Sequence, residues 1–281
     1  MSKPKSRYDY GRDFNPRKYL QQYYKTDDDG KSLEDNLSGY IFRKLNSIFD
    51  TCEKGKGRLM DVGTGPSIAY LIPASLKFHY IYTTDFTPGC RMELTMWCSA
   101  DSAAYEWMGY FKYAARLDQK GEEWEDYEER LRNSIIAILP CDLMCSDPLT
   151  PEKLTPVDVM TASFAFSAAA EDYDDFENSM ERMGEYLSQG GTLILTEYLE
   201  GSYYLVDDEK FHICRLTEED YLRALKYAGF GQFEISKASD ANVAPDGALT
   251  DAQDVIVIKA IKNPPCKDVP LREDSADPEN K

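Results

Sequence analysis

Acidic and aromatic side chains crowd the stretch TEYLEGSYYL, residues 196–205, directly after the apolar run GTLIL. Glu197 and Glu200 could anchor a cation or accept a proton, and Tyr203 and Tyr204 could offer aromatic faces to a ring or a cation. Ligands of open α/β sheets bind beyond the carboxyl ends of the strands, so acids at a strand end are placed to meet one. The stretch therefore predicts part of a binding site; the alternative for each acid alone is a solvated surface carboxylate.

A glycine-rich turn, DVGTGPS, occupies residues 61–67 at the end of a short apolar strand. Gly63 and Gly65 let the backbone turn sharply and approach a ligand closely. A dinucleotide fingerprint would need a third glycine where this chain has Ile68, and Pro66 lacks the N–H that a phosphate would use. The turn therefore favours a ligand without a pyrophosphate.

Two further acids follow predicted strands. Asp85 ends the strand YIYTTDF, where an acid can accept hydrogen bonds from a ribose diol. Asp142, in the segment CDLM, is a suitable acceptor for an adenine amino group. A nucleoside without phosphates fits both acids, because a free carboxylate would repel a phosphate. A plain strand–turn–helix is the alternative.

The elements that would position these side chains follow from the spacing of apolar residues. We predict strands at residues 57–61, 80–86, 139–144, 157–166, 192–199, 232–239 and 254–262. We predict helices at residues 14–25, 32–52 and 68–77, through most of 92–138, and at 174–189 and 217–230, with Asn15 and Thr217 as N-caps and Gly190 as a C-cap. Alternating strands and helices indicate an α/β fold with a doubly wound, mostly parallel sheet covered by helices on both faces.

Charge and cysteine content limit the partners and the compartment. The formal net charge of −18 disfavours nucleic acid and anionic membrane surfaces, and no apolar run reaches the length of a membrane span. The seven cysteines are scattered without the spacing of a zinc or redox site, so we expect reduced thiols, no metal and a cytoplasmic protein. The first residues are charged throughout and do not resemble a signal peptide.

The blocks FNPRKYLQQYYK, DVGTGPS, TTDF, CDL and GSYY, in this order and spacing, resemble the family of small-molecule N-methyltransferases that includes nicotinamide, phenylethanolamine, indolethylamine and thioether methyltransferases. The resemblance runs from about residue 8 to 262. It implies a Rossmann-like seven-stranded core, S-adenosylmethionine as methyl donor, a small amine as acceptor, and a monomer. We accordingly divide the chain into a flexible arm (1–12), a methyltransferase domain (13–262) with an N-terminal helical lid (13–55), and a disordered tail (263–281).

The resemblance also implies roles for individual residues. Tyr19 and Tyr24 would contact the donor from the lid, with Tyr23 beside them on the acceptor side. Asp85 would bind the ribose of the donor. The remaining expected donor contacts are Gly63, Thr64, Gly65, Ser67 and Tyr70 around the methionine part, Asp142 and Leu143 at the adenine, Cys90 in place of an asparagine near the ribose, and Ser163 in place of a threonine.

The acceptor side follows the family less closely. Glu200 stands at the position of an amine-binding glutamate, while Glu197 or Asp251 would accept the proton. Relatives carry an acid at the position of Ser167, and serines that bind a carboxamide at the positions of Gly201 and Ile213. We therefore predict that the acceptor is an arylalkylamine or an indolethylamine, and that pyridines such as nicotinamide are less favoured acceptors. Methylation of a soft atom such as sulfur, and a catalytically idle relative that binds the donor, remain the alternatives.

Overall fold

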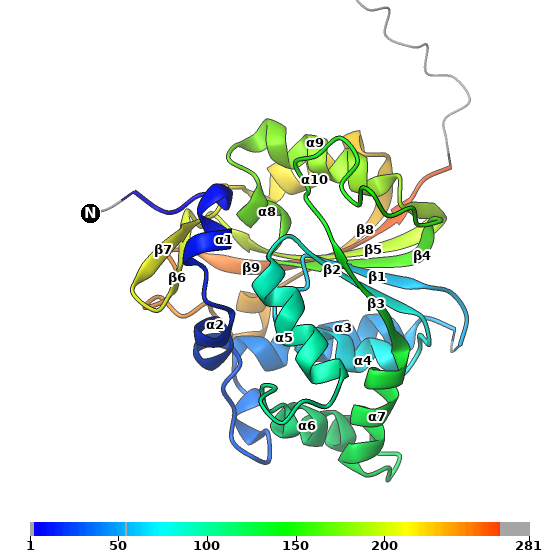
Figure 1. Ribbon diagram of the computed structural model, residues 1–281. Coiled ribbons are helices and arrows are strands. Elements are labelled where there is room, and N and C mark those ends of the chain that lie inside the picture. The colour runs from blue at the N-terminus through cyan, green and yellow to red at the C-terminus, as the bar shows by residue number, and fades with distance from the viewer. Residues whose placement is uncertain (1–2, 54, 265–281) are drawn as a thin grey trace, which may run out of the picture.

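The computed structural model describes residues 3–53 and 55–264 and is built on one seven-stranded sheet (Figure 1). The strands lie in the order β3-β2-β1-β4-β5-β9-β8. Strand β9 runs antiparallel to both of its neighbours, and the pairs from β3 through β5 are parallel. Their bounds are β1 (Leu59–Val62), β2 (Ile81–Asp85), β3 (Ile135–Pro140), β4 (Val157–Ser163), β5 (Leu187–Leu199), β8 (Phe230–Lys237) and β9 (Asp254–Lys262). The predicted α/β class, with a doubly wound and mostly parallel sheet, is confirmed.

Helices cover both faces of the sheet, because successive residues of a buried strand point to opposite sides. In β9, Val255 and Val257 belong to one core, and Ile256 and Ile258 belong to the other. The first core is closed by α3 (Leu37–Asp50), α4 (Ile72–Ser75), α5 (Pro88–Cys98), α6 (Met108–Asp118) and α7 (Trp124–Ser134). The second is closed by α8 (Phe166–Ala169), α9 (Tyr173–Gly184) and α10 (Glu218–Tyr227).

Side-chain caps begin several helices, and three of them bear on the predicted helix starts. Asn15 accepts a hydrogen bond from the backbone N–H of Lys18 at 3.0 Å and begins α2 (Pro16–Tyr23), as predicted. Thr217 and Asp220 form the predicted capping box of α10. The helix predicted from residue 32 begins later, at α3, because Asn36 caps it and a short 3₁₀ turn, η2 (Lys31–Leu33), precedes it.

Other predicted boundaries were also wrong. The helix that was predicted to continue through Ile135 ends at Ser134, and β3 begins at the next residue. The reason is that the β-branched and apolar run from Ile135 pairs with β2. This strand replaces the one predicted at residues 139–144. Helix α9 ends at Gly184, so Gly190 is not its C-cap; it lies inside the long strand β5 with φ +76°.

The N-terminal residues differ from the flexible arm expected at 1–12. They form a 3₁₀ turn, η1 (Arg7–Asp9), and α1 (Tyr10–Asp13), and Lys5 pairs with Phe211 beside a small hairpin. That hairpin, β6 (Tyr203–Val206) with β7 (Glu209–His212), was not predicted and lies next to α1 and α2 in Figure 1. Of the residues 13–55 that were predicted to form a lid, those of α3 pack into the core. The tail expected at 263–281 lies almost wholly outside the described residues.

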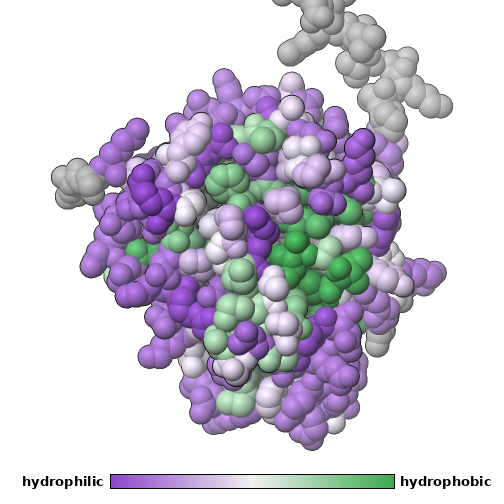
Figure 2. Space-filling model, viewed as in Figure 1, coloured by the Kyte–Doolittle hydropathy of each residue, from purple (hydrophilic) through white to green (hydrophobic). Residues whose placement is uncertain are grey.

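The surface in view is largely hydrophilic, as the acidic composition indicates, with a smaller apolar area where β2 and β3 lie (Figure 2). Phe86, Met92 and Ile136 are among the large apolar side chains that remain exposed. Within the described ranges, every helix is too short or too polar to traverse a lipid bilayer.

Candidate active site

A cavity lies at the carboxyl ends of β1, β2 and β4, the edge at which ligands of open α/β sheets bind. We call it the donor cavity. The residues predicted to contact the donor come together here, although they lie on seven separate stretches of the chain. Those that line the cavity are Tyr19, Tyr24, Gly63, Thr64, Gly65, Ser67, Tyr70, Asp85, Cys90, Asp142, Leu143 and Ser163.

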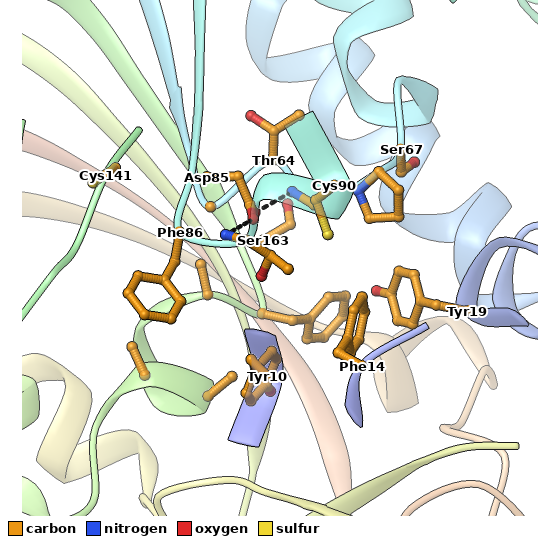
Figure 3. Close-up of a pocket in the computed structure, with 18 of the residues that line it drawn as sticks. Tyr10, Phe14, Tyr19, Thr64, Ser67, Asp85, Phe86, Cys90, Cys141 and Ser163 are labelled. Carbon is orange, nitrogen blue, oxygen red and sulfur yellow. Dashed lines mark hydrogen bonds between the residues drawn. The ribbon is translucent and has the colours of Figure 1, made fainter. Parts of the chain in front are cut away.

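Asp85 ends β2 and faces this cavity (Figure 3). Its carboxylate accepts hydrogen bonds from the backbone N–H of Gly65 at 2.8 Å and of Thr87 at 2.7 Å. Burial raises the pKa of Asp85, and these two N–H donors oppose that shift. The acid therefore connects the glycine turn to the start of α5 while lying on the wall of the cavity.

The glycine turn needs its first glycine for space as well as for conformation. Gly63 has φ +64°, and a Cβ built on it would lie 2.3 Å from the Cβ of Ala165. Any side chain at this position would push the turn away from the segment that follows β4. The turn thus keeps Thr64 and Gly65 against the cavity.

Aromatic rings form the side of the donor cavity opposite Asp85. In Figure 3, Phe14 and Tyr19 lie across the space from Thr64 and Asp85. Tyr19 sits 5.7 Å from Tyr24 between ring centroids, and both rings come from the segment that α2 positions. The predicted contribution of α2 to the cavity wall is therefore present in the structure.

The N-terminal arm supplies a part of the wall that was not predicted from the sequence. Arg7 and Tyr10 both line the donor cavity. Arg7 donates to the carboxylate of Asp142 at 3.0 Å, and the hydroxyl groups of Tyr10 and Tyr204 lie 2.6 Å apart. The aromatic spacing of RYDYGRDF was the available signal, but its mixed charge indicated a loose arm.

Asp61 was not predicted as a site residue, although it is the first residue of the segment DVGTGPS. It lines the donor cavity, is buried, and accepts a hydrogen bond from the hydroxyl of Thr161. Burial raises its pKa to about 6. With Asp85, it gives the cavity two buried acids and an aromatic wall, a combination that suits a cationic nucleoside better than a phosphate.

A second, smaller cavity adjoins the donor cavity, and we call it the acceptor cavity. Four side chains line both cavities and mark their junction: Tyr19, Phe164, Ala168 and Tyr204. Phe164 holds a left-handed backbone conformation, φ +58°, which is rare for a bulky residue, and its ring centroid lies 4.5 Å from that of Tyr198. Strain of this kind concentrates at functional sites.

Ser167 and Glu197 form a buried pair beside the acceptor cavity. Ser167 lines the cavity and donates its hydroxyl proton to the Glu197 carboxylate. Glu197 is 0% exposed and also accepts the backbone N–H groups of Phe166 at 3.0 Å and Ser167 at 3.3 Å. Burial raises the pKa of Glu197 to about 7, against the effect of these donors.

The remaining acceptor-side predictions divide. Tyr23 and Tyr204 line the acceptor cavity, as Ser167 does. Glu200, Asp251 and Tyr203 line neither cavity. The φ of +52° at Glu200 turns the chain after β5, so that this side chain pairs with Arg215 at 3.4 Å.

Asp251 has a structural environment of its own. Its carboxylate accepts the backbone N–H of Ser202 at 2.7 Å and that of Tyr203 at 3.2 Å, which holds the loop before the hairpin. These bonds lower the pKa of Asp251 in spite of partial burial. The structure therefore leaves Glu197 as the one predicted acid that contacts a residue of the acceptor cavity.

Comparison with known proteins is consistent along the whole chain. Residues 3–263 match the model of the NNMT/PNMT/TEMT family. A nicotinamide N-methyltransferase from Homo sapiens is 32% identical, over 77% of this chain and 82% of that protein. A phenylethanolamine N-methyltransferase from Mus musculus is 31% identical, over 79% of this chain and 76% of that protein. An indolethylamine N-methyltransferase from Oryctolagus cuniculus is 31% identical, over 79% and 84%.

Solved structures with far lower identity share the fold. A 1,6-didemethyltoxoflavin-N1-methyltransferase from Burkholderia thailandensis, with 1,6-didemethyltoxoflavin and S-adenosylhomocysteine bound, has a TM-score of 0.51 at 11% identity, covering 94% of this chain and 93% of that one. An S-adenosylmethionine-dependent methyltransferase from Methanosarcina mazei has a TM-score of 0.52 at 13% identity, covering 77% and 97%.

Proposed function

The chain belongs to the NNMT/PNMT/TEMT family of S-adenosylmethionine-dependent methyltransferases, and from this we propose that it methylates the nitrogen of a small amine of the arylalkylamine or indolethylamine type. The observation that carries the proposal is the carboxylate of Glu197, which reaches the acceptor cavity through Ser167. A negative charge behind the cavity wall favours a cationic amine and its methylated product.

The lining of the acceptor cavity also supports an amine over a carboxamide. Tyr19, Tyr23 and Tyr198 supply ring surface on which an aromatic or cationic acceptor can pack. Ile213 lines the same cavity with hydrocarbon, where a carboxamide would need a polar partner. Nicotinamide is therefore a poorer fit than an amine.

When bound, S-adenosylmethionine supplies a methyl group on a positively charged sulfur. We assign its ribose to Asp85 and its adenine to Asp142, two acids that line the donor cavity. Tyr19 and Tyr204 lie at the junction with the acceptor cavity, so they orient the two reactants and exclude water between them. The protein needs little covalent machinery for such a displacement.

A labelled-methyl screen tests this proposal. Arylalkylamines, indolethylamines, pyridines and thioethers are offered together with labelled S-adenosylmethionine, and products are identified by mass. We expect transfer to at least one amine, and loss of that product in Asp85→Ala. Glu234→Gln, at an exposed site on β8 paired with Lys259, is the matched control. Tight donor binding without transfer to any of these acceptors would refute the proposal and favour a catalytically idle relative.

One observation favours a second candidate, methylation of a soft atom such as sulfur. Glu200 and Asp251 lie outside both cavities, and an acceptor without a proton needs no carboxylate. Transfer to thioethers alone, at a rate indifferent to Glu197→Gln, would support this candidate.

We also propose a cytoplasmic monomer. The six described cysteines are free thiols, as expected in a reducing compartment. Light scattering on the purified protein tests the oligomeric state, and fractionation of the source cells tests the compartment.

A further inference from the structure

The buried pair of Ser167 and Glu197 lies beside the acceptor cavity, and the transfer of the methyl group does not itself require such a pair. A nitrogen that carries hydrogen must lose a proton when it becomes a stable methylated amine, whereas a pyridine nitrogen has none to lose. The inference below rests on the proposed N-methylation and concerns which nitrogens the site serves.

Glu197 cannot contact the acceptor directly. It lies on β5 on the same face as Leu195 and Leu199, against α8, and it is 0% exposed. One carboxylate oxygen accepts two backbone N–H groups, from Phe166 and Ser167, and the other accepts the Ser167 hydroxyl. Any proton that reaches Glu197 from the cavity therefore passes through Ser167.

Ser167 is held in the orientation that such a transfer needs. Its carbonyl oxygen accepts the backbone N–H of Cys214 at 2.8 Å, and its own N–H and hydroxyl both donate to Glu197. A serine hydroxyl has one proton and two lone pairs. Because the proton is directed to Glu197, the oxygen can accept a hydrogen bond from an N–H in the acceptor cavity, which Ser167 lines.

We propose that Ser167 and Glu197 form a proton relay, and that this site is therefore built for amines that carry an N–H rather than for pyridine nitrogens. The nitrogen–methyl bond forms as the sulfur–methyl bond breaks, and the electron pair of the broken bond stays on sulfur. The nitrogen gives its proton to Ser167 Oγ, which passes its own proton to Glu197 Oε2, so that Glu197 becomes neutral.

The surroundings of Glu197 suit a proton acceptor that works near neutral pH. Burial raises the pKa of Glu197 to about 7, close to the value that general base catalysis favours. The titratable groups packed around it are Tyr198 on β5, Tyr221 on α10 and Cys214; burial raises the pKa of all three, so they stay neutral. The charges of Asp172, Asp175 and Asp220 also raise the pKa of Cys214, so these acids add negative charge only.

The test compares two acceptors, an arylamine such as aniline and a pyridine, which are both neutral from about pH 6 to about pH 9, so that acceptor ionisation does not contribute. Ser167→Ala and Glu197→Gln are measured beside Ser179→Ala, a buried serine on α9 that donates to the carbonyl of Phe176. We expect both relay variants to lower kcat for the arylamine by at least about tenfold with little change in KM. The wild-type kcat should rise with pH through about 7, and this rise should be absent in Ser167→Ala.

A readout without turnover accompanies the kinetics. The side-chain carboxyl of Glu197, assigned by its loss in Glu197→Gln, is titrated by carbon NMR in the wild type and in Ser167→Ala. We expect titration near neutral pH in the wild type and a higher pKa in the variant, because a hydrogen bond to the ionised form is lost.

Three results would overturn the relay: an arylamine rate within about twofold of wild type in Ser167→Ala, equal losses for pyridine and arylamine, or a Glu197 that titrates near its ordinary pKa. In each case methylation of nitrogen can continue, so the proposed function survives. Transfer to thioethers alone would instead refute the proposed function.

Discussion

Asp85 connects the glycine turn to α5 through the backbone N–H groups of Gly65 and Thr87. Its position at a strand end, on the wall of the donor cavity, makes it the single residue on which donor affinity should depend most. Donor affinity and acceptor chemistry are thus assigned to different acids, Asp85 and Glu197.

We expect Asp85→Ala to weaken binding of S-adenosylhomocysteine by more than about 1.5 kcal/mol, the scale of a charge-assisted hydrogen bond. Titration calorimetry measures this. Asp158→Ala is the control, because Asp158 also accepts a backbone N–H, that of Arg58 at 2.7 Å, but lies outside both cavities. Unchanged affinity in Asp85→Ala would contradict the ribose assignment.

Glu197 should also give the stability of the protein a pH dependence. Folding raises its pKa from 4.5 to about 7, so the folded protein keeps a proton that the unfolded chain releases. This contribution to stability is complete below about pH 4.5 and is lost as the pH rises through about 7.

Glu197→Gln carries no titrating group at this position. We therefore expect the variant to become more stable relative to wild type as the pH rises from about 4.5 to about 7, that is, its free energy of unfolding should increase relative to that of wild type. Urea unfolding at several pH values measures this difference in stability between variant and wild type. For the exposed control Glu234→Gln, the difference should not change with pH. A difference for Glu197→Gln that does not change with pH would show that its pKa is not raised.

At the scale of the element, α2 matters because one short helix carries rings for both cavities. Tyr19 lines the donor and the acceptor cavity, and Tyr23 lines the acceptor cavity. The helix has eight residues, too few to be stable alone, so its N-cap and its packing determine whether these rings are in place.

Replacing the N-cap Asn15 by alanine should destabilise the protein by about 1 kcal/mol and also weaken donor binding, because α2 frays from its N-terminal end. The matched variant is Asn36→Ala, which removes the N-cap of α3, a helix with no residue in either cavity. Thermal unfolding should show similar losses for both variants. Calorimetry should show weaker donor binding for Asn15→Ala alone, and equal binding losses would contradict a special role of α2.

At the scale of the whole molecule, the N-terminal arm crosses from the hairpin to the far end of the sheet. Lys5 makes backbone hydrogen bonds with Lys210 and His212 of β7, both at 2.8 Å. A few residues later Arg7 reaches Asp142, which follows β3 at the opposite side of the donor cavity. The arm thus lines the donor cavity and contacts two separate parts of the fold.

Removing the Arg7–Asp142 contact with Arg7→Ala should weaken donor binding by about 1 kcal/mol, mostly through faster dissociation. The effect should shrink at high salt, because the pair is partly exposed. Stopped-flow measurements of S-adenosylhomocysteine release test this, with Arg12→Ala as the control on the same arm; Arg12 is largely exposed and lines neither cavity. Equal release rates in the two variants would show that the arm does not retain the donor.

The sequence by itself determined the class of the sheet and part of the lining of the donor cavity, although it did not indicate Arg7, Tyr10 or Asp61. Both depend on local patterns: apolar strands, a glycine turn, and acids such as Asp85 at strand ends, which any parallel sheet gathers at one edge. Boundaries such as that between α7 and β3 could not be predicted from local patterns, because Ile135 fits the helical spacing and also favours a strand.

Only the tertiary structure decided which of the predicted acids lies beside the acceptor cavity. In the sequence Glu197 and Glu200 lie three residues apart at a strand end, and both were predicted to face the acceptor. The alternation of β5 turns Glu197 inward toward α8 and Ser167, whereas the left-handed φ of Glu200 turns its side chain toward Arg215. The positions of Arg7 and Tyr10 were likewise decided by the tertiary structure. The charged arm that carries them is held by contacts with the hairpin and with Asp142, which are distant in the sequence.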